Sequence, residues 1–271
     1  MVLRIYSFVS GLQGLFLNRG LFKSLVIRDI ESRYRGTMLG FLWTVVNPLV
    51  MLAVYAFVFG GIFQARWGIQ GHVSSFVEML YCGLIVYNIF AETLTRSPNA
   101  VIANPGYVKK VVFPLELLPI CQLASALFNA VVSLILLCIF LVIHQQYIPI
   151  TALLTPVILL PLILLTGGVA WLLASVGVFF RDLGQIIGVV MSIMLFLSPI
   201  FYPAAAAPAL AAKLMYLNPL TYPIEETRNV LVLGILPNWI HWITSFCVSL
   251  LIGLFGLWAF QRARPAFADV I

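Results

Sequence analysis

The sequence predicts an all-α, polytopic membrane protein that forms a single transmembrane domain over residues 1–271. Hydrophobic residues make up 62% of the chain and charged residues only 9%, whereas soluble domains carry roughly a quarter charged residues to solvate their surface. The basic residues flank long apolar stretches instead of gathering on one polar segment. This placement is typical of a membrane protein and argues against nucleic acid as a partner.

Six apolar segments are long enough to cross a bilayer, because a spanning helix needs about 20 residues at a rise of about 1.5 Å each. They lie at about 38–63, 74–95, 116–143, 151–179, 184–203 and 239–260. Pro156 and Pro161 fall early in the fourth segment, so its start is predicted to be kinked or to form a separate turn.

Three further segments are not predicted to span. In residues 1–17 the apolar positions recur at helical spacing, so 1–37 is predicted to hold an amphipathic helix in the membrane interface, followed by an interface helix. Residues 204–238 contain four prolines and only short apolar runs, which predicts periplasmic re-entrant helices. Residues 261–271 are expected to be a cytoplasmic tail.

The distribution of positive charge predicts the topology. If the N-terminus is cytoplasmic, twelve of the 15 Lys and Arg residues lie inside and only Arg66, Lys213 and Arg228 lie outside. Cytoplasmic segments carry the excess of Lys and Arg in membrane proteins. We therefore expect both termini in the cytoplasm.

The sequence lacks the motifs of an enzyme. No G-x-x-x-x-G-K-[ST] loop, no His/Glu cluster with metal-ligand spacing and no G-x-S-x-G elbow occurs. We expect no catalytic residue, no bound cofactor and no metal on this chain.

Two sets of charged residues stand out. One is a dense stretch before the first span: Arg28, Asp29, Glu31, Arg33, Tyr34 and Arg35. It could set topology against anionic lipid, or it could form a helix that docks a cytoplasmic protein through charge pairs. The other set is Glu78 and Glu92, fourteen residues apart in the second span. Glu92 is expected to pair with Arg96 at i+4, and Glu78 could reach Arg228.

Two pairs of glycines at i, i+4 spacing lie at the beginnings of the first and fifth spans. They are Gly36 with Gly40 and Gly184 with Gly188, and such pairs are expected to permit close helix approach.

Three stretches resemble one family. Residues 28–60 read RDIESRYRGTMLGFLWTVVNPLVMLAVYAFVFG, 197–203 read LSPIFYP and 218–223 read NPLTYP. Together they are similar to the permeases of polysaccharide-export ABC transporters, which include capsule and teichoic-acid exporters. The O-antigen (lipopolysaccharide) branch is the most similar, through Asn47-Pro48 and the VFG of residues 58–60.

The resemblance implies a homodimer of six-helix subunits in a bacterial inner membrane, with two copies of a cytoplasmic ABC ATPase that binds ATP and Mg. Residues 28–36 would then contact the ATPase, with Arg181-Asp182 as a second contact. The 96–114 loop would contain a gate helix, with Asn104, Tyr107, Lys109 and Lys110 as its candidate residues.

A path for a sugar polymer should offer aromatic faces for stacking and few charges that would trap it. The candidates are Phe41, Trp43, Tyr55, Phe59, Tyr81, Tyr87, Phe90, Phe196, Phe201 and Tyr202. The aromatic belts at span ends are the alternative interpretation.

The leading hypothesis is therefore that the chain is the non-catalytic membrane subunit of an ATP-driven exporter. The exporter would move a lipid-linked polysaccharide from cytoplasm to periplasm, and O-antigen is the leading candidate for this cargo. Two alternatives stay open at this point: an exporter of small molecules or lipids with the same fold, and a membrane glycosyl- or phospho-transferase.

Overall fold

The computed structural model describes residues 19–69, 72–108, 113–204, 208, 213, 215 and 217–270, and the following concerns these residues. Five helical segments are long and apolar enough to cross a membrane, so the chain is a polytopic membrane protein. They are Gly40–Ile62, Phe76–Asn99, Leu117–Gln145, Ile150–Phe179 and Trp239–Val270. The amphipathic helix predicted for residues 1–17 lies outside the described residues.

The predicted fifth span, 184–203, is shorter than expected. It forms α8, Leu183–Leu197, whose 15 residues extend about 22 Å against a hydrocarbon core of about 30 Å. The helix ends because Ser198 adopts an extended backbone (φ −91°, ψ 150°) before Pro199. The apolar run continues past the helix, and hydropathy alone did not reveal that break.

The first span is peripheral and the second is central. The first joins η1 (Gly40–Leu42), α3 (Trp43–Tyr55) and the π-helical η2 (Ala56–Ile62), and only 6% of its most apolar stretch is buried. The second begins with α4, Phe76–Arg96, and continues into η3, Ser97–Asn99; 89% of its most apolar stretch is buried. The core of the molecule therefore forms around α4.

A short hairpin between these two spans departs from the all-α prediction. β1 (Arg66–Ile69) pairs antiparallel with β2 (His72–Ser75), with Trp67 opposite Ser74. Two strands of four residues are too short to give a clear alternating pattern in the sequence.

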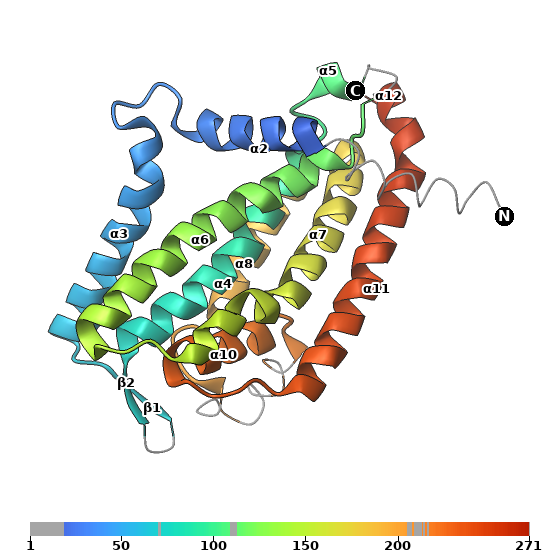
Figure 1. Cartoon of the computed structure of the whole chain (residues 1–271). Coiled ribbons are helices and arrows are strands. Elements are labelled where there is room, and N and C mark those ends of the chain that lie inside the picture. The colour runs from blue at the N-terminus through green and yellow to red at the C-terminus, as the bar shows by residue number, and fades with distance from the viewer. Residues whose placement is uncertain are drawn as a thin grey trace.

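Opposite ends of the bundle carry different elements (Figure 1). At one end lie α2 (Arg19–Tyr34), α5 (Pro105–Val108) and α12 (Phe267–Val270). At the other end lie the hairpin and α10, Thr221–Arg228, which continues into η6, Asn229–Leu233. Both α10 and η6 are too short to cross a membrane, as predicted for the 204–238 segment.

The longest helices run between these two ends. They are α6 (Leu117–Gln145), α7 (Thr155–Phe179, preceded by η4, Ile150–Leu154) and α11 (Trp239–Ala263). Pro161 lies inside α7, and η4 forms the separate turn expected near Pro156.

The closest helix contact uses glycines that the sequence analysis did not select. A Cβ on Gly256 of α11 would lie 2.1 Å from the carbonyl oxygen of Gly168 on α7, and a Cβ on Gly168 would lie 2.6 Å from Cα of Gly253. Of the i, i+4 glycines singled out earlier, Gly184 lies close to η3, since a Cβ on it would be 3.3 Å from Nδ2 of Asn99, whereas Gly188 has open space beside it. Gly36 and Gly40 have positive φ (85° and 49°) and face open space, so they serve the turn after α2.

The C-terminal segment is packed against the bundle. Phe267 of α12 is fully buried against Phe260 of α11. Arg264, in η7 (Arg264–Ala266), donates to the carboxylate of Glu116 at 3.0 Å and to the carbonyl of Phe113 at 3.0 Å. Part of the positive charge at this end therefore fixes the start of α6.

Candidate functional site

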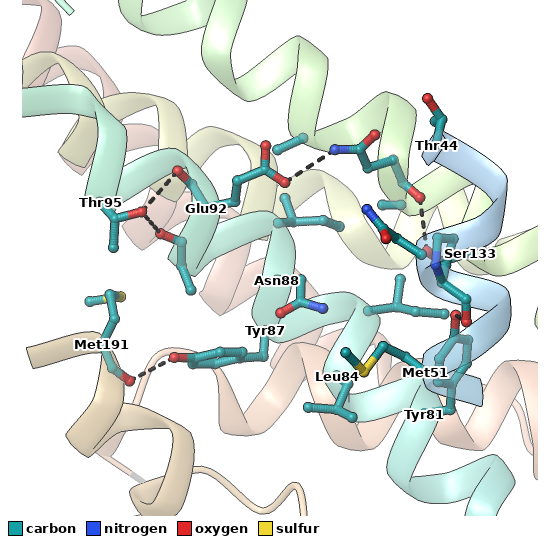
Figure 2. Close-up of a pocket in the computed structure, with 18 of the residues that line it drawn as sticks. Thr44, Met51, Tyr81, Leu84, Tyr87, Asn88, Glu92, Thr95, Ser133 and Met191 are labelled. Atoms are coloured by element: carbon teal, nitrogen blue, oxygen red, sulfur yellow. Dashed lines mark hydrogen bonds between the residues drawn. The ribbon is translucent and has the colours of Figure 1, made fainter. Parts of the chain in front are cut away.

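A polar groove of about 620 Å³ lies within the bundle beside α4, with α3, α6 and α8 as its other walls. Figure 2 shows Tyr87, Asn88 and Glu92 projecting from α4, with Met191 of α8 on one side and Thr44 of α3 on the other. At one end the groove reaches Arg33 and Tyr34 at the end of α2. It therefore runs from the end of α2 into the membrane-spanning part of the chain.

Three exposed polar side chains from three different helices line this groove. They are Asn47 of α3, Asn88 of α4 and Ser192 of α8. Asn88 is the single exposed residue between Val77 and Phe90. Exposing a side-chain amide to hydrocarbon is costly, because no lipid tail accepts its hydrogen bonds. This face of the bundle is therefore unsuited to lipid.

Three of the predicted path aromatics, Tyr55, Tyr81 and Tyr87, line the groove. The hydroxyl of Tyr87 donates to the carbonyl of Met191 at 2.6 Å, and that of Tyr81 donates to the carbonyl of Pro48 at 3.0 Å. These bonds connect α4 to α8 and to α3, so the tyrosines hold the walls together as well as facing the groove.

The other predicted aromatics lie elsewhere: Phe41, Trp43, Phe59, Phe90, Phe196, Phe201 and Tyr202. Phe59 belongs to an aromatic cluster near the hairpin, with its ring 5.1 Å from that of Phe76. Phe196 and Phe201 stack at 5.7 Å, and the hydroxyl of Tyr202 donates to the carbonyl of Phe196. Phe41 and Phe196 are 57% and 64% exposed. A role for these seven in transport stays a prediction.

A network of four alternating charges closes the α2 end of the groove. Arg96 of α4 donates to Asp29 of α2 at 2.6 Å, and Arg33 of α2 pairs with Glu92 of α4. Within each helix, Arg33 lies 3.5 Å from Asp29 and Arg96 lies 3.6 Å from Glu92. Asn129 of α6 donates to Glu92 at 3.3 Å. The expected Glu92–Arg96 pair is thus confirmed, within a larger network that fastens α2 to the central helix.

The pKa of Asp29 is lowered in this network. Burial alone raises it, but hydrogen bonds from Arg96 and Ser125 and the charges of Arg96 and Arg33 outweigh burial. A carboxyl group with a lowered folded pKa contributes stability above its unfolded pKa, and that contribution is lost as the pH falls through the folded pKa.

The contribution of Asp29 to stability is therefore expected to be constant near neutral pH and to disappear in acid. Asp29→Asn should lower the melting temperature near neutral pH and remove part of the acid dependence seen in the wild-type protein. Thermal unfolding of both proteins over a pH series would measure this. Parallel curves for the two proteins down to acidic pH would contradict it.

The residues predicted to contact an ATPase separate into two groups. Asp29 and Arg33 turn inward into the network, whereas Glu31, Arg35, Arg181 and Asp182 are exposed. A surface groove of about 530 Å³ is lined by Arg28, Glu31, Ser32, Tyr34, Arg35, Gly40 and Phe41. The outer face of α2 is therefore free to receive a partner while its inner face is fixed to the bundle.

The predicted gate loop contacts α2 directly. Tyr107 of α5 stacks on Phe113 at 4.2 Å, and its hydroxyl accepts a hydrogen bond from Arg28, whose guanidinium lies 5.3 Å from the ring centre. Asn104 donates its amide to the carbonyl of Ala100 at 3.0 Å and so shapes the turn before α5. Lys109 and Lys110 lie outside the described residues.

Glu78 and Arg228, proposed above to pair, have different partners. Glu78 is fully buried and contacts His144 at 3.1 Å and the amide of Gln145, both on α6. Arg228, 3% exposed, donates to the carbonyls of Met79 at 2.9 Å, Pro199 at 2.5 Å and Ile200 at 2.9 Å. Charge complementarity suggested the pair, but backbone carbonyls, which leave no sequence signal, satisfy the guanidinium.

Within the described part of the chain, no three His, Cys, Asp or Glu residues come close enough to hold a metal ion. The fold and the polar groove together define a polytopic membrane permease. The chain belongs to the ABC-2 type transporter family, whose model matches residues 20–232. It is the non-catalytic transmembrane subunit, and a permease of this family works with an ABC ATPase.

Named relatives match almost the whole chain. An O-antigen export system permease protein RfbA from Myxococcus xanthus is 28% identical over 95% of this chain and 97% of its own length. An RfbA from Klebsiella pneumoniae is 26% identical, covering 93% and 96%. The polysialic acid transport protein KpsM from Escherichia coli is 26% identical, covering 86% and 90%. The similarity to these permeases thus extends over most of the chain.

Proposed function

We propose that this chain is one half of a homodimeric conduit that exports a lipid-linked polysaccharide, with O-antigen the best-supported cargo, driven by two copies of an ABC ATPase. The observation that carries this proposal is the groove with Asn47, Asn88 and Ser192 exposed on three helices. Since lipid cannot cover these groups favourably, a second copy of the chain facing the same groove would enclose a polar path.

The proposal includes an orientation. We place α2, α5 and α12 in the cytoplasm, because the Lys and Arg residues concentrate there, and the α10 end in the periplasm of a bacterial inner membrane. The described part of residues 204–238 then forms a periplasmic lid, and α8 with the turn after it acts as the fifth of six spans.

The similarity to O-antigen and polysialic acid exporters favours a polymer cargo over a small molecule. Membership of the ABC-2 type transporter family argues against the transferase alternative. A small-molecule exporter would instead hold its cargo in a closed pocket, so an ATP-bound structure with a continuous path would favour a polymer and a sealed central pocket would oppose it.

Blocking the groove should stop transport. Asn88→Trp places a large apolar side chain in the polar groove and removes an amide worth about 1 kcal/mol per hydrogen bond, so export should fall at least about fivefold. ATP-dependent polymer uptake into inside-out vesicles that contain the permease and its ATPase would measure this. Leu251→Trp is the matched control, because Leu251 is 68% exposed on α11, away from the groove. Equal export by both variants would contradict the proposed path.

A further inference from the structure

A second, apolar groove lies between α6 and α7. The two helices lie close together near the α2 end and diverge toward the hairpin end (Figure 1). The space between them is about 920 Å³. Its floor is formed by Leu159 and Leu231, which are 5% and 2% exposed, and its rim by Ile135, Ile139 and Leu160.

The lining offers nothing to water. It contains no charged residue, and its single hydroxyl, on Thr155, already donates to the carbonyl of Ala152 at 2.7 Å. Water in such a space would lack partners, and an empty space would forfeit dispersion contacts along both walls. Both walls belong to segments long and apolar enough to span the membrane, so the groove opens into hydrocarbon.

The groove is long enough to hold the lipid chains of one leaflet and has polar side chains at one end. It extends along α6 from Leu127 to Ile143, about 24 Å at 1.5 Å per residue, whereas one leaflet contributes about 15 Å of hydrocarbon. Just beyond it lie His144 and Tyr147, 57% and 62% exposed. Exposed tyrosines mark the headgroup level in membrane proteins.

We propose that this groove is a binding site for the acyl chains of one bilayer phospholipid from the leaflet opposite α2, with its headgroup beside residues 144–147. The lipid would fill the space between α6 and α7 and cover Leu231 of η6, and so support the segment that carries α10. Nothing on the lining would select a particular headgroup, so the affinity for a phospholipid should depend on the length of its acyl chains and not on its headgroup.

A second copy of the chain is not the expected occupant. Under the proposed function the polar groove needs the second copy, and this groove opens among α3, α4 and α8. In Figure 1, α6 lies in front of α4, whereas α8 lies behind α4. This step rests on the proposed dimer and leaves the apolar groove facing lipid.

The test uses the full permease–ATPase complex in nanodiscs of phosphatidylethanolamine and phosphatidylglycerol. After transfer to mild detergent, native mass spectrometry should find one phospholipid per permease chain. Ile139→Trp and Leu160→Trp fill the groove from opposite walls and should each lower that occupancy at least about fivefold, as the loss of roughly 1 kcal/mol of contact predicts. Leu251→Trp, on the exposed face of α11, should retain the wild-type occupancy.

Several results would overturn the inference: no retained lipid in the wild-type complex, equal retention by all variants, or a retained mass that matches a polyprenyl carrier. A disulfide between two copies of an Ile139→Cys variant would also overturn it, because the second copy would then fill the groove. Export measured on the same preparations separates this test from that of the proposed function, since lipid binding can fail while ATP-dependent export is normal.

Discussion

Arg33→Glu is expected to lower ATP-driven export about tenfold, and adding Glu92→Arg should restore most of that loss. The single substitution turns one attraction across the α2–α4 contact into repulsion and places a second carboxylate beside Asp29. Partly exposed pairs of this kind contribute about 0.2–1 kcal/mol each, so reversing one changes the contact by about 0.4–2 kcal/mol, a range that includes a factor of ten. Under the proposed function, the ATPase would then move α2 without moving α4.

The double variant separates contacts between helices from contacts within them. It would leave two acids on α2, at 29 and 33, facing two bases on α4, at 92 and 96. Both cross-helix pairs are then kept, while each i, i+4 pair becomes a like-charge pair that costs about 0.3–0.5 kcal/mol. Recovery of export by the double variant would therefore show that the link between the helices matters.

Export by inside-out vesicles, together with ATPase retention on the purified complex, measures this prediction. Lys23→Glu is the control, because Lys23 is exposed on α2 and lies outside the network. Wild-type export by Arg33→Glu would show that the network does not transmit force. A double variant as weak as the single one would show that the loss has another cause.

The sequence predicted the structural features that are set by residues close together along the chain. The Glu92–Arg96 pair follows from i, i+4 spacing, and the apolar runs located every long helix. The link from Arg96 to Asp29 joins residues 67 positions apart. No local pattern specifies which face of α2 meets α4, and this is why Asp29 and Arg33 were both assigned to an outer contact.

Glycine positions show the same limit. Gly36 and Gly40 have the spacing of a helix contact but serve a turn, whereas Gly168 and Gly256 belong to different helices and meet at backbone distance. Spacing along one helix cannot identify a pair that forms between two. The sequence analysis singled out the tyrosines of the polar groove and the charged Arg33 and Glu92, but not Asn88, which stands out by its exposure and not by its residue type.

Arg228 connects four segments at the α10 end, and its removal is expected to have the largest effect on stability. Besides the carbonyls of Met79, Pro199 and Ile200, its guanidinium lies 4.5 Å from the ring centre of Trp67 in the hairpin. Gly83 makes room for it, since a Cβ there would lie 2.8 Å from Nη2 of Arg228. The start of α4, the turn after α8, the hairpin and α10 are thus held by one side chain.

Arg228→Met should therefore lower the free energy of unfolding by about 3–5 kcal/mol, because it removes charge-assisted hydrogen bonds and leaves buried carbonyls unpaired. Arg228→Lys should recover part of this loss, since an ammonium keeps the charge but lacks the planar fork that reaches several carbonyls at once. Thermal unfolding in detergent, followed by size-exclusion chromatography, measures both variants. Lys213→Met is the control, because Lys213 is an exposed cation in the same 204–238 segment. Similar stability for Arg228→Met and Lys213→Met would mean that the four segments are held by apolar packing alone, and the buried guanidinium would then need a role in transport to explain its cost.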